Sequence, residues 1–256
     1  MDTLALKLLL TPALIGGASL VGRRWGPAVS GWLVGVPFTS GPITLVLALT
    51  HGVGFAEAAA AGTLAGTISQ AGFCVTYAWL AGRCGWLLAA AGSTLVFAGL
   101  TAALRSLPLP AGPLFLATIP VIVLALRFLP TSGGPEPGAP VALPRWDLPA
   151  RMAVATGFVV LLTGVAPALG PRLTGLLAPF PLYGAVLAGF AHALQGPAQA
   201  TLVLKGLLLG LFTFAGFFLM LATLLQRAGI GPAFGAAILT GCVLQGGSLW
   251  WLRRSG

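Results

Sequence analysis

Long apolar runs cover most of the chain, and short stretches with arginine, proline or glycine separate them. Several runs reach or exceed the roughly 20 apolar residues with which an α-helix crosses a bilayer. We read the first run as a membrane helix and not as a cleaved leader, because Lys7 lies within it and no clear small-residue cleavage site follows. The chain is therefore expected to be an all-α polytopic membrane protein. Its predicted spans, about nine in number, are 4–21, 27–50, 54–81, 85–104, 109–129, 150–168, 171–194, 197–226 and 230–252.

Residues 130–149 interrupt this pattern with a stretch that is rich in proline and glycine and contains Glu136 and Asp147. That composition is typical of an exposed linker. The predicted divisions of the chain are a first four-helix unit at 1–108, a linker helix with its loop at 109–149, and a second four-helix unit at 150–256.

The two units resemble each other in sequence. Sliding the chain by 144 positions aligns residues 26–100 with 170–244 without a gap, and 20 of the 75 aligned positions are identical. A composition so rich in Gly, Ala and Leu gives roughly one identity in ten by chance. The match indicates a duplicated four-helix unit. The identities include Gly26/Gly170, Pro27/Pro171, Pro37/Pro181, Gly52/Gly196, Gly62/Gly206, Gly66/Gly210, Phe73/Phe217 and Arg83/Arg227.

The number of spans sets the orientation of the second unit. An odd number of crossings separates the first helices of the two units, so the units would be inverted, provided that 109–129 crosses fully. Basic loops usually stay in the cytoplasm, so the side with more arginines is expected inside, the C-terminus inside and the N-terminus outside. That side carries Arg23, Arg24, Arg83, Arg127, Arg145, Arg151, Arg253 and Arg254, and the other carries Lys7, Arg105, Arg172 and Arg227.

Composition excludes several other classes of protein. Hydrophobic residues make up 57% of the chain and charged residues 7%, with a mean hydropathy of +1.00, whereas soluble domains carry about a quarter charged residues. Loop arginines account for the net charge of +9, and no basic patch on a solvated fold indicates a nucleic-acid partner. Cys74, Cys84 and Cys242 are widely spaced and lack neighbouring histidines, so we expect no metal site and no other cofactor.

Two predicted spans contain helix-breaking residues at matching places, in GPAVSGWLVGVPFTSGP at 26–42 and GPRLTGLLAPFPLYGAV at 170–186. Proline removes a backbone donor and glycine weakens a helix, and an interrupted backbone persists in a bilayer only where protein or water covers it. Paired interruptions in inverted repeats point to a binding site near the membrane midplane, although two proline kinks without a ligand would leave the same pattern. The predicted substrate-binding residues are Pro37, Thr39, Ser40, Gly41, Pro179, Phe180, Pro181, Tyr183 and Gly184.

Four ionisable residues fall within or beside predicted spans. Lys205 aligns with Ala61, one helical turn after Glu57, so a Glu57–Lys205 pair or a proton-coupling role for Glu57 is a functional hypothesis. In the alternative, Glu57 caps a helix start and Lys205 extends to the membrane surface. His51 and His192 end the second and seventh spans, where each could accept a proton. Hydrogen bonds to backbone carbonyls are the interpretation we favour for both histidines.

The motif GLLAPFPLY at 175–183, followed by AH at 191–192, resembles the GlpM family of small bacterial inner-membrane proteins. The resemblance covers most of 150–252 and, more faintly, 1–104, where GWLVGVPFT at 31–39 keeps only one of the two prolines. Members are about the length of one four-helix unit, so the resemblance implies a topology rather than a defined activity. By analogy with small transporters, a dual-topology dimer would have been fused here, with the linker span inverting the second copy.

We therefore expect an integral membrane transporter of an unidentified small solute or lipid in the bacterial inner membrane. We expect the lipid bilayer to surround the protein. The sequence leaves open whether the protein forms a homodimer. The alternative is a non-transporting accessory membrane protein of an envelope or polymer-export complex, which the scarcity of polar groups favours. An enzyme is not expected, because the sequence offers no embedded cluster of acids, histidines or serines.

Overall fold

A computed structural model of the chain describes residues 3–37, 40–104, 110–130, 144, 146–157 and 180–254. These residues form helices and short connections, and no strand occurs among them. The fold is therefore all-α, as predicted. The helices are α1 (Thr3–Trp25), α2 (Pro27–Val34), α3 (Ser40–His51), α4 (Val53–Ala81), α5 (Trp86–Leu104), α6 (Ala111–Phe128), a helix within 147–157, α8 (Leu182–Gln195), α9 (Pro197–Ala228) and α10 (Ile230–Arg254).

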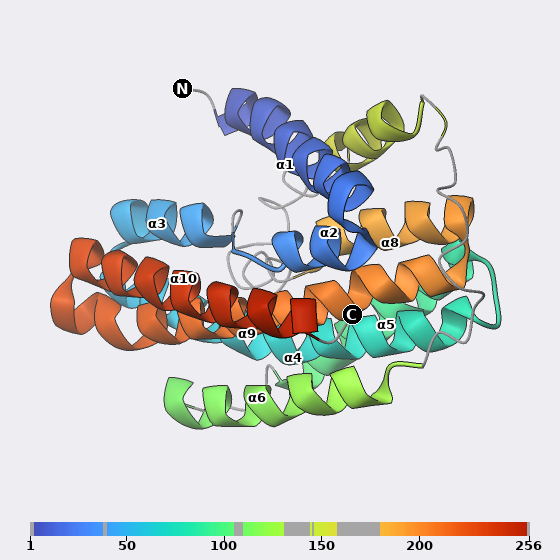
Figure 1. Cartoon of the computed structure of the whole chain (residues 1–256). Coiled ribbons are helices and arrows are strands. Elements are labelled where there is room, and N and C mark those ends of the chain that lie inside the picture. The colour runs from blue at the N-terminus through green and yellow to red at the C-terminus, as the bar shows by residue number, and fades with distance from the viewer. Residues whose placement is uncertain are drawn as a thin grey trace.

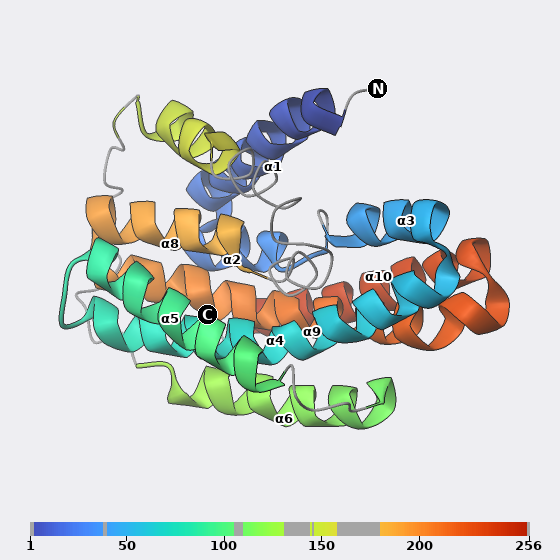
Figure 2. The same cartoon turned by 180° about the vertical axis from the view of Figure 1, so that it is seen from behind.

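The helices α4 and α9 lie side by side at the centre and run in opposite directions (Figure 1). Glu57 near the start of α4 bonds to Gln226 near the end of α9. Tyr77 near the end of α4 contacts His192, which lies just before α9 begins. Figures 1 and 2 show α10 covering α9 on one side of the molecule and α5 covering α4 on the other. The two long helices therefore form the core on which α2, α3, α5, α6, α8 and α10 pack, whereas α1 packs on α2 and α8.

Among the described residues, five helices are long and apolar enough to cross a membrane. Their composition and length are those of a membrane-embedded protein. They are α4, α5, α6, α9 and the part of α10 at Ile230–Gly247. The predicted span 27–50 is instead two helices, because α2 ends at Val34, the described residues 35–37 are not helical, and α3 begins at Ser40. Most of the predicted span 150–168, and residues 171–179 of the next span, lie outside the described residues.

The 144-residue offset recurs in the structure of the described helices. Gly52 ends α3 and Gly196 ends α8, and both have positive φ angles, 88° and 95°, which favour glycine. Gly72 packs against Leu100 of α5, and Gly216 packs against Leu244 of α10. The helix pair α4 and α5 is therefore built like the pair α9 and α10, with contacts at matching positions.

Asp147 overturns part of the linker prediction. The sequence places it in an exposed linker, but its side chain is fully buried. Its two carboxylate oxygens accept hydrogen bonds from Arg23 Nη2 at 3.0 Å and from Arg151 Nε at 2.8 Å. The guanidinium of Arg151 also lies over the ring of Phe190, 5.2 Å from its centre. The end of the linker is therefore joined to α1 and α8 rather than left in solvent.

Candidate functional site

The first candidate site is the break between α2 and α3. The helix α2 ends at Val34, and Pro37, which is buried, lies in the non-helical connection. Proline cannot donate to a helical carbonyl, so the interruption predicted from the sequence is confirmed at this position. The N–H of Gly41 donates to the carbonyl of Pro37 at 3.0 Å, and the Thr44 hydroxyl donates to the carbonyl of Ser40 at 2.9 Å. Thr39, another predicted site residue, lies outside the described part of the chain.

Glycines bring this break against the middle of α9. A side chain at Gly31 or Gly206 would collide with backbone atoms of the facing helix, and Gly35 lies directly against Gly210. Small residues of this kind allow membrane helices to approach at backbone distance. Just beyond the break, the position of a Cβ on Gly41 is 3.3 Å from the ring of Phe217. The break between α2 and α3 therefore lies at mid-length of the most buried helix.

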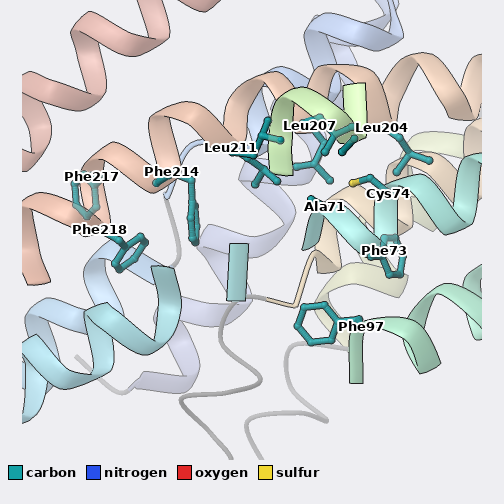
Figure 3. Close-up of a cluster of buried hydrophobic side chains, with 14 of the residues drawn as sticks. Ala71, Phe73, Cys74, Phe97, Leu204, Leu207, Leu211, Phe214, Phe217 and Phe218 are labelled. Atoms are coloured by element: carbon teal, nitrogen blue, oxygen red, sulfur yellow. The ribbon is translucent and has the colours of Figure 1, made fainter. Parts of the chain in front are cut away.

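The second candidate site, called the second break below, consists of the non-helical residues Phe180 and Pro181 directly before α8; the residues that precede Phe180 lie outside the described part of the chain. Pro181 precedes Leu182, where α8 begins, and the ring of Phe180 stands edge-on to Phe73 and Phe97, with centroids 5.9 and 5.3 Å away. Figure 3 shows Phe73 on α4 and Phe97 on α5 within the same buried cluster as the leucines of α9. The position of a Cβ on Gly184 is 2.5 Å from the side chain of Leu207. Of the other predicted residues, Tyr183 is half-buried and Pro179 lies outside the described residues.

The two breaks share one feature that the sequence repeat explains. Phe73 and Phe217 are aligned under the 144-residue offset, and each lies against one break, Phe73 through Phe180 and Phe217 through Gly41. Sequence reasoning did not select these phenylalanines, although their identity in both units is a signal that could have found them. Both breaks are therefore lined by aromatic rings, with the buried Ser40 as a polar residue at the first.

Glu57 and Lys205 do not form the predicted ion pair, whereas the proton-coupling role of Glu57 stays a prediction. Glu57 Oε2 accepts the backbone N–H of Gln226 at 2.9 Å, and its Oε1 accepts the side-chain amide at 3.3 Å. Gln226 and Lys205 are 21 residues apart on α9, or about 32 Å at 1.5 Å per residue. Lys205 is half-buried. The two charges lie towards opposite ends of the molecule.

The two histidines have different surroundings. His192 is close to Tyr77, with its Nδ1 3.5 Å from the phenol oxygen and the two rings at 72°. His51 is exposed and stacks on Phe55, with centroids 5.1 Å apart. Neither histidine lies at a candidate site, since His192 is in the last turn of α8, about 15 Å along the helix from Leu182 at 1.5 Å per residue.

Gln70 on α4 is a buried polar residue, and its Oε1 has no hydrogen-bond partner among the described residues. Side-chain bonds that join neighbouring helices include Thr101 to Ser69 and Thr213 to Gln245. The described histidine, cysteine and acidic side chains form no group of three that could hold a metal ion.

The chain matches no family model, no curated protein and no solved structure in comparisons with known proteins. The resemblance to the GlpM family therefore stays a prediction from its short motif.

Proposed function

We propose that this protein is an integral membrane transporter of a small solute or a lipid, which binds at the breaks before α3 and α8. The break between α2 and α3 is the observation that carries the proposal. It lies against Gly210 and Phe217, on either side of the midpoint of α9. A non-helical backbone at such a depth needs a protein or solvent partner, and transporters use interrupted helices as binding sites.

The proposed architecture consists of two inverted units with nine spans in the bacterial inner membrane, the N-terminus outside and the C-terminus inside. The antiparallel course of α4 and α9, which are aligned helices of the two units, supports the inversion. The distribution of arginines supports the orientation. Trp79 bonds to the carbonyl of Phe128, so Arg83 and Arg127 lie at one end of the bundle, whereas Arg227 lies at the end where Glu57 binds Gln226.

The lining of the breaks bears on the substrate class. The rings of Phe73, Phe97, Phe180 and Phe217 lie at the two candidate sites. Aromatic surroundings favour a substrate with a large apolar portion over a small inorganic ion. A lipid or an apolar solute is therefore the substrate class we favour.

A non-transporting accessory role is the second candidate, and one observation favours it. The ring of Phe180 lies between Phe73 and Phe97 and makes an edge-on contact with each of these two rings. Packing of this kind stabilises a fixed bundle and needs no bound molecule. In that case the breaks would be structural kinks.

Accessibility of Ser40 to thiol reagents from the two sides of the membrane distinguishes these functions. Cys74, Cys84 and Cys242 are first replaced by serine or alanine, and Ser40→Cys is then treated with a membrane-impermeant methanethiosulfonate in right-side-out and inside-out vesicles. Because Ser40 is 5% exposed and lies at the break, alternating access predicts slow modification from both sides. Modification from neither side would favour the accessory role.

Thr118→Cys is the matched control for this experiment. Thr118 is fully buried on α6, where its hydroxyl donates to the carbonyl of Leu114 at 2.8 Å, and α6 packs on α4 and α9. It should stay unmodified from both sides. Equal labelling of the two variants would mean that the reagent reaches buried positions by unfolding, and would remove the support for transport.

A further inference from the structure

We propose that the arginines at the end of α1 bind the phosphate of an anionic phospholipid headgroup, a site independent of the transport proposal. The cluster comprises Arg23, Arg24, Asp147 and Arg151. It lies where α1 meets the helix at 147–157, and its charge, exposure and apolar surroundings together point to a lipid.

The first argument for this site is the net positive charge of the cluster. Asp147 gives one oxygen to Arg23 and the other to Arg151, so its single negative charge is shared by two guanidinium groups. Arg24 adds a third positive charge and forms no hydrogen bond or ion pair with the described residues. Glu57 is the other acid that the structure describes, and it binds Gln226 at the far end of α4. Two positive charges therefore stay uncompensated by described protein groups.

The second argument is that two of the arginine side chains are exposed at the surface. Arg151 is almost buried, with 7% of its side chain exposed, whereas 36% of Arg23 is exposed. Each guanidinium has five N–H donors, and the described hydrogen bonds of Arg23 use one nitrogen, Nη2, on Asp147. The carboxylate fixes the position of Arg23 without using its whole donor capacity. Arg23 and Arg24 thus present N–H groups at the surface, and phosphate oxygens are their natural acceptors.

The apolar surroundings favour a lipid over a free phosphate. Leu20 lies one turn before Arg24, on the same face of α1, and is 54% exposed. Trp25 and Trp146 are 63% and 57% exposed, one directly after Arg24 and the other directly before Asp147. Tryptophans gather at the headgroup level of membranes, and basic clusters beside membrane helices bind anionic lipids. The leucine and tryptophans would contact the acyl and glycerol parts of the same lipid.

Native mass spectrometry of the purified full-length chain tests this site. The protein is released from micelles that contain equal amounts of phosphatidylglycerol and phosphatidylcholine, and the bound lipid is counted. The wild-type chain should retain phosphatidylglycerol preferentially. Arg24→Gln should lower that preference about fivefold, the effect of one basic residue at a membrane surface, and Arg23→Lys should lower it through loss of the bidentate geometry.

Arg24 has no described partner, so its replacement should leave the fold intact, and an unchanged elution profile checks this. Arg227→Gln is the control, because that exposed arginine lies beside the Glu57–Gln226 contact, where a carboxylate offsets its charge. It should change the preference less than twofold. Unchanged lipid preference in both Arg24→Gln and Arg23→Lys would overturn the proposal. Displacement of the lipid by millimolar inorganic phosphate would also overturn it, since the site would then recognise phosphate alone.

Discussion

The helix pairs α4/α5 and α9/α10 are built from the same contacts but have different neighbours. Gly72 and Leu100 in the first pair match Gly216 and Leu244 in the second. A hydrogen bond between Thr101 and Ser69 matches one between Gln245 and Thr213. Each matching pair of positions differs by 144, the offset of the sequence repeat. The repeat therefore preserves how each helix pair packs internally.

The difference between the pairs lies in how the rest of the chain packs on them. Gly206 of α9 contacts the backbone of α2 at Ala28, whereas its counterpart Gly62 on α4 has no described atom within reach of a Cβ. Gln245, which stands where the first pair has Thr101, is long enough to reach the carbonyl of Trp32 at 3.5 Å. Internal packing is shared by the two pairs. Among the described residues, the contact with α2 distinguishes α9 from α4, and the segment 171–178 that aligns with α2 lies outside the described residues.

The largest expected effect comes from adding a methyl group at Gly206. Because a Cβ there would collide with the backbone of α2, Gly206→Ala must displace that helix, and we expect a loss of about 3 kcal/mol in stability. Gly62→Ala meets no atom of the described residues within 4 Å and should stay within about 1 kcal/mol of the wild type, on the stabilising side. Thermal unfolding of both variants in detergent measures the contrast. Equal loss in both would mean that α2 does not pack on α9 through this glycine.

A smaller and equal effect is expected at Gly72 and Gly216. A Cβ at either position meets the flexible end of a leucine, Leu100 or Leu244, which can change rotamer. Each Gly→Ala substitution should therefore cost about 1–2 kcal/mol. In a double-mutant cycle, the Gly→Ala substitution should cost less when the facing leucine is already alanine. A large difference between the two positions, measured in the same unfolding assay, would contradict the equivalence of the helix pairs.

The smallest expected effect comes from the hydrogen bonds between helices. Ser69→Ala removes a bond to Thr101, and Thr213→Val removes a bond to Gln245. Bonds of this type between membrane helices contribute about 0.6 kcal/mol on average. The second substitution should cost more, since Gln245 also bonds to the carbonyl of Trp32 and would lose its orientation. A greater loss for Ser69→Ala would contradict the proposed link to α2.

The interruption at Pro37 was predictable from the sequence, because a proline without an N–H acts locally and needs no knowledge of neighbours. The turn glycines Gly52 and Gly196 were visible in the same way, as identities of the repeat. The role of either break as a binding site stays a prediction.

Properties set by distant contacts were not predictable. Asp147 lies in a polar, proline-rich stretch whose composition predicts exposure to solvent. Its side chain is nevertheless buried and accepts a hydrogen bond from Arg23, 124 positions away in the sequence. The Glu57–Lys205 pair failed for a related reason. Alignment put the two residues on equivalent faces, but equivalent positions on antiparallel helices meet only near the crossing point, and both residues lie towards helix ends.

The inverted arrangement of the two units is the central claim, and native Cys84 offers a direct test. Cys84 follows α4, and its aligned position is Ala228 at the end of α9. One chain keeps Cys84 alone, and the other carries Ala228→Cys alone, so no loop arginine is altered. A membrane-impermeant maleimide should modify Cys84 from the cytoplasmic side and the introduced cysteine from the opposite side. Modification of both from the same side would contradict the account.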